Sequence, residues 1–224
     1  MEKSIQALAF VVAFLTIPGR GDGSEPMPVF ITPYYSAEPG QTEIRVGKYS
    51  DRLAQADAGT IQALATDMAR ERDTLPPETL YVLAIRLFDL GQRDDGVYWF
   101  YTAQMRSRML AALMDEEQSG AIGDPAFELR QAHQAFFELT GPFFNRFAFG
   151  DLERLKETLR RVAKESKSRL DWRSFAPEAH FLPEDQWPSR CEHVKNGLAG
   201  LIDTIERSEA SIRAERAANG LDNR

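Results

Sequence analysis

Residues 80–104 read LYVLAIRLFDLGQRDDGVYWFYTAQ, and this stretch decides the fold. Apolar side chains recur at spacings of three and four residues before Gly91 and again after it, as on one face of an α-helix. Gly91 is a natural end for a helix, because glycine adopts the left-handed conformation without strain. Small residues, namely Ala84, Gly96 and Ala103, stand where two helices would cross closely. The stretch therefore predicts two antiparallel helices packed as a hairpin.

These residues resemble a tetratricopeptide-like helical hairpin, including the related Sel-one-like type. The matching positions are Leu80, Leu83, Ala84 and Phe88 in the first helix and Gly96, Trp99, Phe100 and Ala103 in the second. The match covers one hairpin, about a tenth of the chain, and no second copy follows at a period near 34 residues. The resemblance implies a body of helical hairpins and not a regular solenoid. Any closely packed antiparallel helix pair also needs small residues at its crossing, and that plainer interpretation stays open.

The same periodicity predicts further helices on both sides of this hairpin. We expect helices over residues 60–72, 78–90, 94 to about 117, 152–168 and 191–216, and one that begins at Asp124-Pro125. The faces expected to be buried include Ile61, Leu64, Ala65 and Met68, and further along Leu152, Leu155, Leu159 and Val162. Asp94 and Asp124 are expected as N-terminal caps. Gly141-Pro142 and Gly150-Asp151 are expected to break helices, and residues 170–190 to form an irregular, aromatic-rich packed loop.

The N-terminus has a different pattern. Residues Ile5 to Ile17 read IQALAFVVAFLTI without a charge, which is shorter than the roughly 20 apolar residues that span a bilayer. Helix-breaking and polar residues follow as far as Ser24, so we predict a signal peptide over residues 1–23 and a periplasmic protein. The alternative is a buried N-terminal helix.

The rest of the chain divides into three parts by composition. Residues 24–50 contain four prolines and are predicted to form an extended arm with one short hairpin. Residues 51–216 are predicted to form a single helical domain, and residues 217–224 a frayed tail. The predicted fold class is all-α, a helical-hairpin array preceded by an extended N-terminal arm.

The overall composition limits the function classes. The chain has 224 residues, of which 43% are hydrophobic and 27% charged, as in a globular protein with a core. A net charge of −7 argues against nucleic acid, because phosphate binding needs a basic face. An acidic surface suits solubility, or a basic protein partner. Cys191 is the only cysteine, so no disulfide can form within the chain.

No arrangement of residues typical of catalysis stands out. Cys191 and His193 lie two residues apart with no second pair nearby, whereas a metal site needs three or four convergent ligands. Paired carboxylates such as Asp94-Asp95 can cleave glycosides, but this pair is better explained as a helix cap. Basic groups read as exposed helix faces; these are Arg106, Arg108, Arg160, Arg161 and Lys164. We therefore expect no enzyme activity, no metal and no cofactor.

Surplus aromatic and acidic residues favour a protein partner, because Tyr and Trp are the usual anchors of interfaces. The candidate contact residues are Asp94, Asp95, Tyr98, Tyr101, Asp115, Glu116, Glu117 and Trp187, and Tyr34 and Tyr35 are further aromatics that we expect to be exposed. The segments AIRLFDLGQRDDGVYWFY (84–101) and NRFAFGD (145–151) are also similar to those of exported bacterial envelope proteins of the immunity type. This resemblance implies a protein that binds and occludes a toxin delivered to the periplasm. A scaffold or adaptor of the envelope is the alternative, and an envelope hydrolase is the least favoured.

Overall fold

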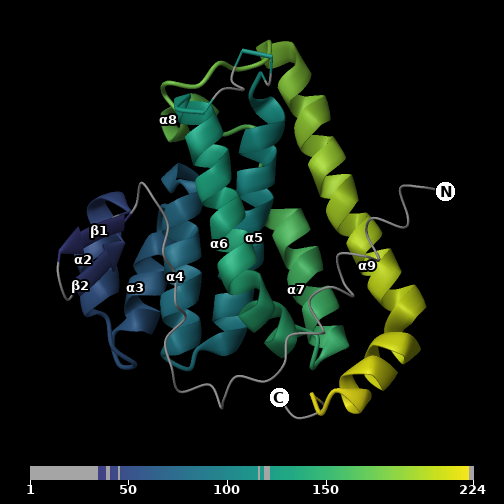
Figure 1. Cartoon of the computed structure of the whole chain (residues 1–224). Coiled ribbons are helices and arrows are strands. Elements are labelled where there is room, and N and C mark those ends of the chain that lie inside the picture. Colours follow the sequence, from purple (N-terminus) through teal and green to yellow (C-terminus); the bar gives the residue numbers. More distant parts are fainter. Residues whose placement is uncertain (1–34, 39–40, 45, 116, 119–121, 222–224) are drawn as a thin grey trace.

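In the computed structural model the described part of the chain is all-α apart from one β-hairpin, which agrees with the predicted class (Figure 1). The structure describes residues 35–38, 41–44, 46–115, 117–118 and 122–221. The predicted signal peptide lies outside the described residues, as does Tyr34. Strands β1 (Tyr35–Glu38) and β2 (Gln41–Ile44) pair antiparallel, with Tyr35 opposite Ile44. This pairing is the short hairpin expected in the arm.

Helix α5 is the central element among the longer helices. In chain order the helices are α2 (Ser50–Gln55), α3 (Ile61–Arg70), α4 (Pro77–Asp89), α5 (Arg93–Leu113), α6 (Pro125–Ala148), α7 (Leu152–Glu165), α8 (Trp172–Phe175) and α9 (Trp187–Ala218). Short 3-10 helices connect some of them: η1 (Gly47–Tyr49), η2 (Arg72–Thr74) and η3 (Glu184–Gln186). Helix α5 contacts α4, α6, α7 and α9. Helix α9 runs along one side of the body, and in this view the β-hairpin is at the opposite side (Figure 1).

The close crossing predicted between α4 and α5 is confirmed. A Cβ atom added to Gly96 would lie 3.1 Å from the carbonyl oxygen of Ala84 and 3.1 Å from the backbone nitrogen of Phe88. Ala84 and Ala103 are completely buried. At the turn, Gly91 has a φ of 86°, and the Gln92 N–H donates to the Leu87 carbonyl at 2.8 Å, a hydrogen bond typical of glycine-terminated helices. Small residues thus let the two backbones approach.

One hydrophobic cluster, from Val46 to Ile212, forms the core of the described chain. Its centre is aromatic: the ring of Phe100 stacks on Phe144 at 4.4 Å, and Tyr81 stacks on Phe136 at 5.0 Å, which joins α4 and α5 to α6. The predicted inner faces of α3 and α7 are buried as expected. Hydrophobic burial therefore selects the faces that the periodicity indicated.

The helix break expected at Gly141-Pro142 is wrong, because α6 continues through Pro142. Proline removes one backbone hydrogen bond and normally disfavours a helix interior. Here Phe136 and Phe144, on either side of the proline, are both completely buried. Burial of both aromatic residues along one helix outweighs the local preference to break. The cap predicted at Asp124 is confirmed, since its side chain accepts from two backbone N–H groups at the start of α6. The break predicted at Gly150-Asp151 is also confirmed, and there Asp151 caps α7.

The predicted bounds of α5 also need correction. Asp94 lies in the first turn of α5 and does not cap it, because Gln92 occupies the N-cap position. The helix ends at Leu113 instead of near Glu117. The reason is backbone pairing with a distant segment. The Leu113 carbonyl accepts from the Leu182 N–H at 2.9 Å, and the Asp115 N–H donates to the backbone carbonyl of His180 at 2.9 Å.

The last helix is longer than predicted at both ends. Helix α9 begins at Trp187 and not at Cys191, with Pro188 in its first turn, where proline is favoured. It ends at Ala218, where the Leu221 N–H donates to the Arg216 carbonyl at 2.9 Å. No helix of the described residues combines the length and the apolar character needed to cross a bilayer.

Candidate functional site

The predicted contact residues fall into two groups at opposite ends of α5. Asp94 and Asp95 lie in its first turn, and Asp115 and Glu117 follow its last residue. A helix of 21 residues is about 30 Å long, so the two groups cannot form one compact contact surface. Glu116 lies outside the described residues.

Tyr98 and Tyr101 were expected to be exposed, and this is wrong. Tyr98 is only 6% exposed and Tyr101 only 5%, and both hydroxyl groups form hydrogen bonds within the protein. The Tyr101 hydroxyl donates to the side-chain oxygen of Asn145 at 2.9 Å, and the Tyr98 hydroxyl donates to Glu165 at 2.6 Å. The physical reason is that α5 is central, so its polar-tipped aromatic residues also meet neighbouring helices. Neither side chain offers a surface to a partner.

The acidic groups differ in how they are held. Asp94 forms an ion pair of 3.1 Å with Arg154, which joins the start of α5 to α7. Asp115 accepts hydrogen bonds from the Glu117 backbone at 3.1 Å and from the Gln118 side chain at 2.7 Å. Glu117 itself is exposed. Only the group after α5 therefore combines an ordered carboxylate with a freely exposed one.

A set of half-buried aromatic side chains lies beside that second acidic group. The rings of Phe181 and Trp187 are 5.6 Å apart, and the guanidinium of Arg173 lies over both, at 5.2 and 5.3 Å. The indole N–H of Trp187 donates to the Leu182 carbonyl at 2.8 Å, which fixes the ring. Ile122, which lies between α5 and α6 and three residues before α6 begins, is 89% exposed.

We call this region the α8 end, which is at the top in Figure 1. It comprises Asp115, Glu117, Ile122, Arg173, Phe181 and Trp187. The backbone pairing between residues 113–115 and 180–182 holds its two halves together. Of the residues predicted from sequence, the structure brings together Asp115, Glu117 and Trp187.

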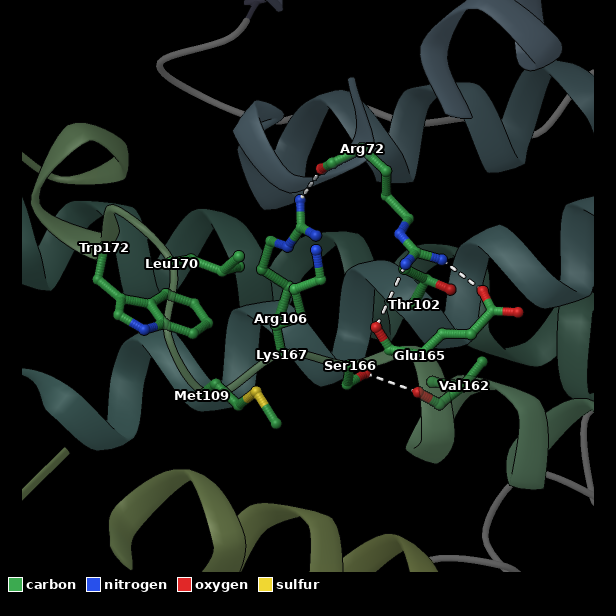
Figure 2. A pocket seen from close by; sticks show the side chains of 10 residues that line it. All are labelled: Arg72, Thr102, Arg106, Met109, Val162, Glu165, Ser166, Lys167, Leu170 and Trp172. Atoms are coloured by element: carbon green, nitrogen blue, oxygen red, sulfur yellow. Dashed lines mark hydrogen bonds and ion pairs between the residues drawn. The ribbon is translucent and has the colours of Figure 1, made fainter. Parts of the chain in front are cut away.

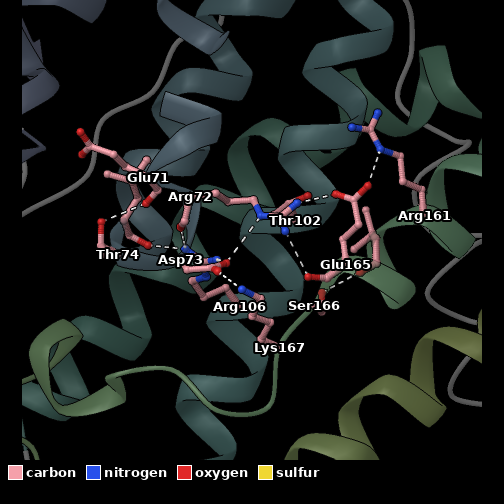
Figure 3. A network of polar contacts seen from close by, with 12 residues as sticks. Glu71, Arg72, Asp73, Thr74, Thr102, Arg106, Arg161, Glu165, Ser166 and Lys167 are labelled. Carbon is pink, nitrogen blue, oxygen red and sulfur yellow. Dashed lines mark hydrogen bonds and ion pairs between the residues drawn. The ribbon is translucent and has the colours of Figure 1, made fainter. Parts of the chain in front are cut away.

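A second feature is a polar junction between η2, α5 and α7 (Figure 3). Arg72 forms an ion pair with Glu165 and donates to the Tyr98 hydroxyl at 2.8 Å. Glu165 also accepts from Arg161 at 2.9 Å, and the Arg161 guanidinium lies 3.9 Å from the centre of the Tyr98 ring. The junction ties segments that are 93 residues apart in the chain.

Arg106, which we expected on an exposed helix face, is buried in the same junction. The residue is 6% exposed, and one of its terminal nitrogens donates to the carbonyl oxygens of Arg72 and Leu75. Its position in the sequence contained a signal: it follows Ala103 by three residues and precedes Leu110 by four, so it shares their buried face. Arg72 and Glu165 offered no such signal, because their partners are far away in sequence.

The junction changes the acidity of its members. Burial alone would raise the pKa of Glu165, but hydrogen bonds from Tyr98, Arg161 and Arg72 outweigh it and lower the pKa to about 2. Burial, assisted by the nearby charge of Arg72, lowers the pKa of Arg106 to about 10. The Glu165 carboxylate is thus held in its charged form, whereas burial disfavours the charged form of Arg106.

A small pocket opens beside these groups, with about 10 Å³ of free space (Figure 2). Its lining is Arg72, Thr102, Arg106, Met109, Val162, Glu165, Ser166, Lys167, Leu170 and Trp172. This space accommodates one water molecule or one small ion. It is too small for an organic substrate.

A larger cleft of about 330 Å³ lies at the start of α4, lined mainly by residues 46–49 and 74–79. Glu78 is part of this lining and is 3.2 Å from the Nε2 atom of His133. Both residues are buried, so the pair joins α4 to α6 within the core. A carboxylate–imidazole pair can transfer protons, and it is the arrangement here closest to acid–base chemistry.

The Cys191–His193 pair lacks the properties of a catalytic nucleophile. Cys191 is completely buried, its thiol points to the Ser168 carbonyl at 3.7 Å, and burial raises its pKa to about 11. His193 is exposed. Within the described part of the chain, no group of three or more His, Cys, Asp or Glu residues is placed to hold a metal ion.

Comparisons with known proteins give one relevant similarity. An uncharacterised protein of Haemophilus influenzae is 29% identical over 182 residues, which cover 79% of this chain and 66% of that protein. The chain thus spans just under two thirds of the length of that relative. No family model matches the chain, and no solved structure is significantly similar to it. The tetratricopeptide-like resemblance of the α4–α5 hairpin therefore stays a prediction.

Proposed function

We propose that this protein is an exported protein-binding module that contacts its partner through the α8 end. The concrete form of the proposal is an immunity protein that occludes a toxin in the periplasm, as the resemblance of residues 84–101 and 145–151 implies. Export rests on the uncharged segment Ile5–Ile17 and the helix-breaking residues after it.

The observation that carries the proposal is the composition of the α8 end. Trp187, Phe181 and Arg173 are of the residue types that dominate interface energetics, and they are only partly covered here. Ile122 is 89% exposed, more than Leu139 and Phe143, the other large apolar residues that stand out to solvent in the described chain. A partner that covered these side chains would gain from apolar burial.

Charge supports the same end. Asp115 and Glu117 border the aromatic group, and the whole chain has a net charge of −7. Acidic groups at the rim of a contact accelerate association with a basic partner, because complementary charge steers the encounter. We therefore infer a partner with a basic contact surface.

Occlusion is tested by co-expressing the protein with the product of a neighbouring gene, exported to the periplasm of a sensitive host. We expect protection and a stoichiometric complex. The Ile122→Ser variant should weaken the complex by about tenfold or more if Ile122 is an anchor. Leu139→Ser is the matched control, because Leu139 is exposed and apolar but lies on α6, outside the α8 end. Equal affinities of the two variants would contradict the proposed surface.

Two further outcomes would redirect the proposal. A stable complex that gives no protection from any toxin would indicate the scaffold or adaptor instead. Turnover of peptidoglycan or ester substrates that is lost on Glu78→Gln would indicate an enzyme, since Glu78 belongs to the buried pair with His133.

Export has its own test. N-terminal sequencing of the protein from an envelope fraction should begin close to Ser24, after the apolar segment. Recovery of the chain with Met1 intact from a cytoplasmic fraction would refute export, and it would leave the proposed contact surface to be judged separately.

A further inference from the structure

The polar junction contains more positive than negative charge. Its cations are Arg72, Arg106, Arg161 and Lys167, and its carboxylates are Asp73 and Glu165. The charge of Asp95 also acts on Arg161, so four positive charges meet three negative ones, in a chain whose net charge is −7. The excess is local and does not follow from the composition. Charges removed from water require compensation nearby.

Arg106 is the most buried cation of the junction, and its hydrogen bonds are to the carbonyl oxygens of Arg72 and Leu75, not to a carboxylate. Its side chain is 7% exposed, and the carboxylate that it approaches among the described residues, Asp73, lies 4.0 Å away. Asp73 must also compensate Lys167, which contacts it, and Arg72 at 3.8 Å. Charge-assisted hydrogen bonds need about 2.7–2.9 Å, so the Asp73–Arg106 pair attracts without bonding. The ring of Phe175, 5.7 Å from the guanidinium, offers only a weak cation–π contact.

The small pocket lies directly beside this arginine, with Lys167 pointing toward the guanidinium (Figure 2). The two hydroxyl groups of its lining are already used, because Thr102 donates to the Tyr98 carbonyl and Ser166 donates to Val162. One terminal nitrogen of Arg106 already donates to the Arg72 and Leu75 carbonyls, and the Lys167 ammonium group contacts Asp73. The donors that remain for a ligand are therefore the other N–H groups of the guanidinium and the remaining protons of the ammonium group. About 10 Å³ of space limits that ligand to a size near that of one water molecule.

We propose that this pocket binds one small monovalent anion, of the size of chloride, between Arg106 and Lys167. The anion supplies the negative charge that Asp73 and Glu165 do not. The lowered pKa of Arg106 agrees with this role, since an anion beside the guanidinium would favour its charged form. Phosphate, sulfate and nucleotides are too large for the space. The site uses no residue of the α8 end, and so it is independent of the proposed function.

The test is the line width of the ³⁵Cl NMR signal with the full-length protein in sodium chloride, because bound chloride relaxes faster than free chloride. The wild type should broaden the line, and bromide should reverse the effect by competition. Lys167→Gln removes one of the two donors from an exposed side chain and should weaken binding about tenfold. Lys164→Gln is the matched control, because Lys164 is an exposed lysine of α7 outside the pocket lining.

Broadening that is lost in Lys167→Gln and kept in Lys164→Gln supports the site. Equal broadening by all three proteins, or none by the wild type, overturns it. Sulfate that displaces chloride as effectively as bromide does would overturn the size limit. A crystal grown in sodium bromide gives a direct second measurement: the bromine anomalous peak should lie between Arg106 and Lys167, and its absence there would refute the proposal.

Discussion

Helix α5 takes part in two contacts that are built in opposite ways. On one side it crosses α4 at Gly96, where backbones touch and the neighbouring side chains are apolar. On another side it meets η2 and α7 through Arg106 and Tyr98, where charged and hydroxyl groups are buried together. The crossing uses residues close in sequence, and the junction joins segments far apart. The comparison teaches that a helix can be fixed by close apolar packing at one contact and by polar groups at another.

The largest expected effect is at the apolar contact. Phe100 is completely buried and stacks on Phe144, so Phe100→Ala should leave a cavity among rings that cannot close it. We expect a loss of about 3–5 kcal/mol in the free energy of unfolding, measured by urea denaturation. A loss below that of replacing an exposed aromatic residue such as Phe143 by Ala would show that the crossing is loosely packed.

Overpacking tests the same contact from the opposite direction. Ala84 is completely buried, and its carbonyl oxygen is one of the atoms that approach Gly96. Ala84→Leu should force the helices apart and cost about 1–3 kcal/mol, visible as a lower melting temperature. Ala210→Leu on the exposed side of α9 is the matched control and should change little. An unchanged melting temperature for Ala84→Leu would mean that α4 and α5 do not cross closely at this point.

The two contacts also differ in how far the sequence predicts them. Gly91, Gly96 and Ala84 predict the hairpin because helix stops and close crossings depend on neighbouring residues. Pro142 was misinterpreted for the complementary reason, since its local preference loses to the burial of Phe136 and Phe144. Local patterns are sufficient where the interaction partners are close in sequence.

The candidate sites depend on partners that are distant in sequence. Nothing near Tyr98 indicates that its hydroxyl meets Glu165, and nothing near Asp115 indicates its pairing with His180. Only Arg106 had a local signal, because it shares a helix face with Ala103 and Leu110. The sequence therefore predicts Trp187 and Asp115 as separate candidates, and only the fold places them in one surface.

The polar contact should show itself in the pH dependence of stability. The pKa of Glu165 is lowered from 4.5 to about 2 in the folded protein, so the folded state holds the proton less tightly than the unfolded state. Stabilisation by this group is therefore complete well above pH 4.5 and is lost as the pH falls toward 2. Since the side chain is one third exposed, we expect about 1–2 kcal/mol after screening by solvent.

The measurement is the free energy of unfolding of wild type and Glu165→Gln between pH 7 and pH 3. The difference between them should shrink as the pH falls. Glu157→Gln, on the exposed face of α7, should follow the wild type in parallel. A difference between wild type and Glu165→Gln that stays constant with pH would show that this carboxylate is not held by its three partners.

The smallest expected effect separates the hydroxyl group from the ring at the same contact. Tyr98 donates to Glu165 at 2.6 Å and accepts from Arg72 at 2.8 Å, while its ring lies under Arg161. Tyr98→Phe keeps the ring and its cation–π contact but removes both hydrogen bonds, so we expect a loss of about 1 kcal/mol. In a double-mutant cycle with Glu165→Gln, the two losses should be less than additive, because they delete the same hydrogen bond.

Tyr101→Phe is the control, because the Tyr101 hydroxyl donates to Asn145 on a different helix. Its loss of stability should simply add to that of Glu165→Gln. If Tyr98→Phe and Tyr101→Phe behaved alike in this cycle, the hydrogen bonds of the junction would contribute independently of one another.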